Sequence, residues 1–170
     1  MCDYSQFIQQ ANWLSPEDMN VPLHIENWLS LSTSLTAQLR SSFPTINIQV
    51  LTEYWVNSVS QNEQDFFVRT HKQFWCREVL LNSDTQPLIF ARTLIPNTLL
   101  AAHSELQQLG NRALGEWLFT RPDRIRTKLE WSYEPDKKFY ARRALMQIGH
   151  ETMMVAELFL ASDIFTRRIK

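Results

Sequence analysis

The chain has 170 residues, of which 44% are hydrophobic, and a formal net charge of −1 at pH 7. This length suits one domain over residues 1–170, and this hydrophobic share excludes a globally disordered chain. A near-neutral charge without a basic block argues against nucleic-acid binding, and no apolar run approaches the ~20 residues of a membrane-spanning helix.

The cysteines, histidines and glycines exclude several kinds of site. Cys2 and Cys76 lie far apart in the sequence, which argues against a disulfide framework and against a zinc site. The four histidines have no metal-type spacing, and the three glycines form no phosphate-binding loop. The start, MCDYSQFIQQ, lacks the basic and apolar regions of a signal peptide. We therefore expect a cytoplasmic protein with no stable membrane insertion and no metal.

The N-terminal third is predicted to be helical. Residues 15–18, SPED, form a helix-start signal with serine as cap and proline at the first helical position. The hydroxyl-rich segment 30–36, SLSTSLT, suits a second helix start, whose N–H groups are capped by serine and threonine or hold an anion. Four apolar residues recur at spacings of three and four, which predicts one face of a helix: Trp28, Leu31, Leu35 and Leu39.

After Pro44 the apolar pattern changes to a period of two, which predicts β-strands. The expected strands cover residues 46–55, 74–81, 88–95, 125–133, 139–148 and 153–160. A helix is expected over 97–109, with Gly110 as its C-terminal cap, and a short helical turn over 114–119. The sum is an α+β fold, a mostly antiparallel sheet with helices packed on it.

Arginines interrupt two of these apolar strands, Arg77 in FWCREVLL and Arg92 in FARTLIP. Strand alternation places Arg77 on an apolar face, and Glu157 occupies an equivalent position in the last strand. A buried charge needs a partner, so Arg77 and Glu157 form either a structural ion pair or part of a site for an anionic ligand. The planar guanidinium suits a carboxylate ligand. Arg92 presents the same choice.

Two further groups near these strands receive simpler interpretations. Cys76 alternates with Arg77, so we expect it to face the opposite side as a small core residue rather than to act as a nucleophile. Arg142 and Arg143 follow each other in an expected strand, and we interpret them as a solvated pair at the edge of that strand.

Four motifs resemble, in their order and rough spacing, those of the bacterial chorismate lyase family of ubiquinone biosynthesis. They are FWCREVLL (74–81), FARTLIP (90–96), RALGEWLF (112–119) and VAELFLAS (155–162). The resemblance implies an α+β fold with a buried, flap-covered ligand cavity. It also implies conversion of chorismate to 4-hydroxybenzoate and pyruvate, the first committed step of that pathway, without a metal or organic cofactor.

The resemblance also implies roles for individual residues. Arg77 matches the arginine that grips the ring carboxylate, and the backbone N–H groups of Leu35 and Leu114 match two further contacts to it. Leu35 stands where the family pattern has methionine, but it keeps the N–H group. Glu157 matches the glutamate near the ring hydroxyl, where it positions that group or transfers a proton. For Arg92, to which the resemblance assigns no role, we consider two roles in this reaction: it meets the enolpyruvyl carboxylate, or it neutralises Glu157.

An alternative function is a sensing domain that binds an aromatic carboxylate without turnover, because regulators with such domains resemble the same fold. Those domains follow a basic helix-turn-helix segment, and the residues before the expected sheet lack that basic balance. We therefore favour the lyase, acting as a monomer on chorismate and releasing 4-hydroxybenzoate.

Overall fold

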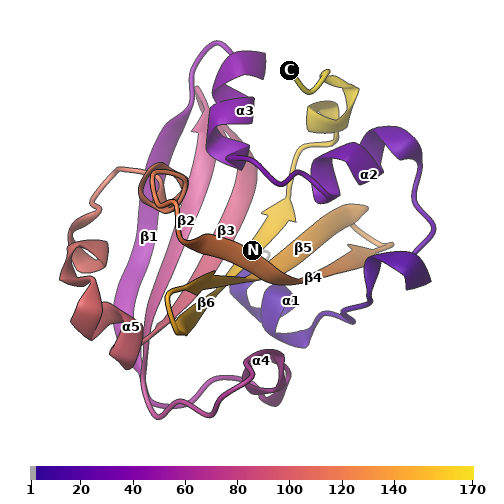
Figure 1. The fold of residues 1–170 in the computed structure, drawn as a ribbon. Coiled ribbons are helices and arrows are strands. Elements are labelled where there is room, and N and C mark those ends of the chain that lie inside the picture. The colour runs from indigo at the N-terminus through magenta and orange to yellow at the C-terminus, as the bar shows by residue number, and fades with distance from the viewer. Residues whose placement is uncertain (1–2) are drawn as a thin grey trace.

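The computed structural model describes residues 3–170 as one antiparallel sheet with helices on both faces (Figure 1). The strands are β1 (Asn47–Val56), β2 (Phe74–Ser83), β3 (Gln86–Pro96), β4 (Arg124–Glu134), β5 (Phe139–Ile148) and β6 (Glu151–Phe159). The α-helices are α1 (Tyr4–Gln10), α2 (Leu23–Leu29), α3 (Leu35–Ser42), α4 (Gln61–Phe66), α5 (Asn97–Ala102) and α6 (Leu114–Leu118). Short 3₁₀ turns are η1 (Pro16–Asp18), η2 (Ser104–Gln108) and η3 (Ser162–Thr166). The predicted α+β class is confirmed.

The strand order is β1-β2-β3-β6-β5-β4, so two three-stranded meanders meet where β3 pairs with β6. Arg77 on β2 lies opposite Thr93 on β3, and Glu157 on β6 lies opposite Ala91 on the same strand. Because side chains alternate along each strand, this register places Arg77 and Glu157 on the same face of the sheet. We call that face the cavity face.

Each face of the sheet has its own core. On the cavity face, apolar residues of α2, α3 and η3 pack against the sheet, and in Figure 1 these three elements gather near the top of the view. On the opposite face, which we call the α1 face, residues of α1 and α4 pack on β2, β3, β5 and β6. Cys76 belongs to this second core, as predicted from its alternation with Arg77.

The predicted helical face around residues 28–39 belongs to two helices rather than one. Helix α2 ends at Leu29, and α3 begins at Leu35. The side chain of Ser34 accepts a hydrogen bond of 3.2 Å from the N–H of Ala37 and so caps α3. Hydroxyl side chains compete with helix continuation by bonding to the nearby backbone, which explains the break. The capping role predicted for this segment is confirmed.

The predicted helix over 97–109 is also divided. Helix α5 ends at Ala102, and η2 begins after His103, whose φ of −138° is not helical. Gly110 follows with a φ of +57°, in the left-handed region that favours glycine, as expected for a residue just past a helical segment. None of the helices in the described residues is long and apolar enough to cross a membrane. Cys2 lies outside the described residues.

The interpretation of Arg142 and Arg143 as a solvated pair is wrong. Strand β5, which carries both, lies between β4 and β6 and is not an edge of the sheet. The two residues are only 6% and 5% exposed. Arg142 points to the cavity face, where it pairs with Glu157, and Arg143 pairs with Glu130 on the α1 face. Local sequence gave no sign of strand order, which decides whether a strand is interior.

Candidate active site

A cavity lies between the sheet and the first turns of α3 and α6. The space within it that the centre of a water molecule can reach is about 80 Å³. Its walls are mainly apolar with a few charged groups, the mix that is typical of small-molecule sites. The strands contribute Arg77, Val79, Val155 and Glu157 to its lining, and the helices contribute Leu35 and Leu114. All four residues that the family resemblance names therefore come together here.

Arg77 is the most buried cation of this cavity, at 2% exposure. Its Nη1 donates to the carboxylate of Glu53 on the neighbouring strand β1. Its Nη2 donates to the backbone carbonyls of Gly110 and Arg112, at 2.7 and 3.0 Å. These three bonds use three of the five guanidinium N–H groups, and the other two are available to a ligand. The alternative of a structural Arg77–Glu157 ion pair is wrong, because Glu53 is the partner.

Glu157 pairs instead with Arg142, which lies directly opposite it on β5. The Nε of Arg142 donates to Oε2 of Glu157, and its Nη1 donates to the carbonyls of Trp28 and Leu31 at 3.2 and 3.0 Å. Arg142 thus fixes the carboxylate to the end of α2. Sequence reasoning missed Arg142 as a candidate site residue. It follows Ala141, whose side chain belongs to the core of the α1 face, so strand alternation points Arg142 to the cavity face.

Leu35 and Leu114 are the first residues of α3 and α6. Backbone N–H groups in the first turn of a helix have no acceptor within that helix, so both are available at the cavity. The two helix starts approach closely at Gly115, where an added Cβ would lie 3.1 Å from Oγ of Ser34. The absence of a side chain at Gly115 therefore lets the two N–H groups converge.

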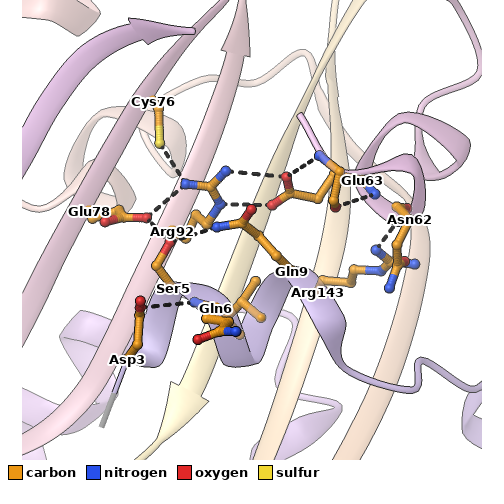
Figure 2. Close-up of polar contacts among 12 residues, drawn as sticks. Asp3, Ser5, Gln6, Gln9, Asn62, Glu63, Cys76, Glu78, Arg92 and Arg143 are labelled. Atoms are coloured by element: carbon orange, nitrogen blue, oxygen red, sulfur yellow. Dashed lines mark hydrogen bonds and ion pairs between the residues drawn. The ribbon is translucent and has the colours of Figure 1, made fainter. Parts of the chain in front are cut away.

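Arg92 lies on the α1 face and is not among the residues that line the cavity. Figure 2 shows its guanidinium between two carboxylates. The Nε and Nη2 donate to the two oxygens of Glu63 at 2.7 and 3.2 Å, and Nη1 donates to Glu78 at 2.7 Å. The expectation that Arg92 neutralises Glu157 is wrong, because strand alternation separates them onto opposite faces.

The Arg92 cluster is closed to solvent. Glu63 is 0% exposed and Arg92 is 3% exposed. Burial by itself lowers the pKa of Arg92, but the hydrogen bonds and charge of Glu63 outweigh it and raise that pKa. Burial also raises the pKa of the Cys76 thiol to about 11, so this thiol stays protonated at neutral pH. The cluster is a saturated ionic network that joins α4 and the sheet.

Sequence reasoning also missed Glu63, which was visible as part of a helix-start motif. Ser60 accepts a bond of 3.2 Å from the N–H of Glu63, and Glu63 accepts one of 3.3 Å from the N–H of Ser60. This reciprocal capping box has the pattern of serine followed three positions later by glutamate. The pattern could have predicted α4, but it could not have paired Glu63 with Arg92.

The fold and the cavity together define a class of protein: an antiparallel α+β protein with an enclosed, arginine-lined site suited to a small anionic molecule. Within that class, the family model described as chorismate lyase matches residues 7–170. The chain belongs to the chorismate lyase family.

Similar proteins agree with this assignment. A protein of Pasteurella multocida (strain Pm70) named "Probable chorismate pyruvate-lyase" is 58% identical over 170 residues, which cover 100% of both chains. One of Bartonella henselae with the same name is 31% identical over 152 residues, which are 89% of this chain and 88% of that protein. The "Chorismate pyruvate-lyase" of Hamiltonella defensa is 28% identical over 157 residues, which are 92% of this chain and 89% of that protein.

Proposed function

We propose that this protein cleaves chorismate to 4-hydroxybenzoate and pyruvate, the reaction that opens ubiquinone biosynthesis. The observation that carries the proposal is the cavity that brings Arg77 and Glu157 together on one face of the sheet, in a chain of the chorismate lyase family. The 58% identity over full length to a probable chorismate pyruvate-lyase supports the same reaction.

The ring carboxylate of the substrate binds at Arg77. Two guanidinium N–H groups of Arg77 bond neither to Glu53 nor to the carbonyls of Gly110 and Arg112, and these two groups donate to the carboxylate. The backbone N–H groups of Leu35 and Leu114 complete its coordination. Charge-assisted hydrogen bonds of this kind are stronger than hydrogen bonds between neutral groups. Because β2 and β6 are two strand spacings apart, about 10 Å, a ring held at Arg77 extends toward Glu157.

The reaction is an elimination and needs no electron acceptor. C4 of the ring loses its hydrogen as a proton, the bond between C3 and the ether oxygen breaks, and the new ring double bond makes the product aromatic. The released enolpyruvate takes up a proton and becomes pyruvate. Aromatisation drives the step, so holding the ring in the reactive orientation supplies much of the catalysis.

Glu157 binds the C4 hydroxyl. Its Oε2 accepts from Arg142, which leaves Oε1 as an acceptor for the substrate hydroxyl. This position lies opposite the ring carboxylate, because C1 and C4 are para to each other. Glu157 therefore fixes the far end of the ring, and the C4 proton passes to a base that this carboxylate orients or to the carboxylate itself.

The test is a direct assay of the purified protein with chorismate. Pyruvate is followed by coupling to lactate dehydrogenase, and 4-hydroxybenzoate by its ultraviolet absorbance. We expect the two products in equal amounts, without added metal. Saturable binding of chorismate with neither product formed would overturn the lyase and favour the sensing domain.

We also propose that the protein works in the cytoplasm as a monomer. The cavity of a single chain already brings together Arg77, Glu157, Leu35 and Leu114, the residues assigned to the substrate. Sedimentation equilibrium at micromolar concentration should give the mass of one chain, and cell fractionation should place the protein with cytoplasmic markers. A stable dimer or recovery with membranes would contradict these proposals.

A further inference from the structure

A second hollow, which we call the second lobe, adjoins the cavity beside Glu157. The two lobes share six lining residues, which therefore stand at their junction: Arg142, Val155 and Glu157 from the sheet, and Thr33, Leu118 and Phe119 from outside it. The first lobe extends from this junction to Arg77, whereas the second extends to Arg126 on β4. Arg126 does not line the first lobe, and Arg77 does not line the second.

The second lobe carries an excess of positive charge. Its described lining residues include two cations, Arg126 and Arg142, but one carboxylate, Glu157. Burial and the neighbouring charge of Arg142 lower the pKa of Arg126, and the opposing effect of Glu157 does not compensate for them. Both guanidinium groups remain charged at neutral pH, because arginine does not lose its proton in proteins.

The two cations are held in place by backbone carbonyls rather than by further carboxylates. Arg126 donates to the carbonyls of Leu31 and Ser30 at 2.9 and 3.2 Å, and Arg142 also donates to the carbonyl of Leu31. These bonds orient the guanidinium groups but do not cancel their charge. Each group keeps N–H donors beyond the bonds that the described residues make, so an anion can bind between them.

The chemistry of chorismate places its second carboxylate in this lobe. With the C1 carboxylate at Arg77, C4 lies at Glu157, and the adjacent C3 carries the enolpyruvyl ether. The ether therefore leaves the ring at the junction of the two lobes. We propose, on the basis of the proposed lyase function, that Arg126 and Arg142 bind the carboxylate of the enolpyruvyl side chain. This role replaces the one first considered for Arg92, which lies on the opposite face.

This assignment explains how the site treats substrate and product differently. Chorismate has two carboxylates and engages both lobes, whereas 4-hydroxybenzoate has one and engages only the Arg77 lobe. Arg126 thus becomes a binding residue for the leaving group, and its removal weakens substrate binding without weakening product binding.

The first test compares Arg126→Gln with Lys128→Gln. Lys128 is a matched control, because it lies on the same strand but points to the α1 face, where its Nζ lies 4.7 Å from the ring centroid of Phe66. We expect Arg126→Gln to lower kcat/KM for chorismate roughly 10- to 100-fold, the range for losing a charge-assisted hydrogen bond, with the inhibition constant of 4-hydroxybenzoate within about 2-fold of the parent. Arg126→Lys should recover part of the loss, and Lys128→Gln should behave as the parent.

The second test needs no turnover. Titration calorimetry with 3-(carboxymethoxy)-4-hydroxybenzoate, a stable dicarboxylate, is compared with 4-hydroxybenzoate. In the parent protein the dicarboxylate should bind about 10-fold or more tightly than the monocarboxylate, and Arg126→Gln should remove that preference. This arm separates the two proposals, because a non-catalytic protein would fail the assay for pyruvate and still show the preference.

Several results would overturn the inference. Equal weakening of chorismate and 4-hydroxybenzoate by Arg126→Gln would assign the residue a structural role at the end of α2. An unchanged kcat/KM would show that the lobe contributes nothing to substrate binding. A parent protein that binds the dicarboxylate no more tightly than 4-hydroxybenzoate would exclude a second carboxylate site.

Discussion

The two faces of the sheet each bury an arginine from neighbouring strands, and the two arginines have opposite surroundings. On the cavity face, Arg77 has one carboxylate partner, Glu53, and two backbone carbonyls. On the α1 face, Arg92 has two carboxylate partners, Glu63 and Glu78. The exposures of Arg77 and Arg92 are almost equal, at 2% and 3%. Burial alone therefore does not distinguish a binding residue from a structural one.

The difference lies in what remains available to a ligand. The N–H groups of Arg92 are directed to two carboxylates and to the sulfur of Cys76, and Arg92 is not among the residues that line the cavity. Arg77 retains two N–H groups and faces an empty space. A buried arginine is thus a candidate for ligand binding when some of its N–H groups make no hydrogen bond and a cavity lies beside it. The predictions below test this distinction, beginning with the largest expected effect.

The largest effect is expected on stability, from Arg92→Gln. This change leaves Glu63 fully buried without its cation, which typically costs about 3–5 kcal/mol of the free energy of unfolding. Urea unfolding measures that loss, while the activity of the remaining folded protein should stay near the parent value.

A combined variant guards against a failure of Arg92→Gln to fold. Arg92→Met with Glu63→Leu and Glu78→Met removes all three charges together, so no buried charge is left unpaired, and much of the stability should return. Full stability of Arg92→Gln itself would mean that the cluster is not the structural network described here.

The next effect is expected on activity, from Arg77→Gln. Removing one partner of a buried charge pair with a carboxylate ligand costs about 2–5 kcal/mol, so kcat/KM should fall by roughly 30- to 5,000-fold. The affinity for 4-hydroxybenzoate should fall with it, because both molecules use this lobe. Stability should suffer less than in Arg92→Gln, because Glu53 is 24% exposed and regains water. Release of pyruvate at the parent rate would remove Arg77 from the site.

A smaller loss is expected from Glu157→Gln. The amide keeps the shape and a hydrogen-bond acceptor for the C4 hydroxyl but loses the charge that pairs with Arg142. For a residue that positions the hydroxyl we expect kcat to fall about tenfold, in line with one weakened hydrogen bond. Steady-state kinetics with chorismate provide the measurement. A loss of 10³-fold or more would indicate instead that Glu157 itself transfers the proton.

The smallest effect is expected at the helix starts, from Gly115→Ala. The new methyl group presses on Oγ of Ser34, which caps α3, and should cost about 1 kcal/mol of stability with a few-fold loss of kcat/KM. Ser34→Ala removes the same cap without the clash. If the clash is the cause, the double variant should lose less than the sum of the single changes in a double-mutant cycle. Strict additivity would place the effect of Gly115→Ala elsewhere.

The sequence alone determined the side on which most of these residues lie. Strand alternation is a local property of the backbone, so the apolar pattern sufficed to place Arg77 and Cys76 on opposite faces. The shared face of Arg77 and Glu157 follows from the register of β2 and β6 against β3. The strands were predicted almost to their ends, because each is bounded by turn residues. The family motifs added the role proposed for Leu35 and Leu114, which no local pattern could have suggested.

Only the tertiary structure decided which charges meet. Arg77 pairs with Glu53 because β1 and β2 are neighbours, and Glu157 pairs with Arg142 because β5 runs beside β6. The order of strands in a sheet depends on contacts between distant segments, and local pattern carries no information about it. For the same reason Arg142 and Arg143 are buried, although two consecutive charged residues favoured a solvated pair.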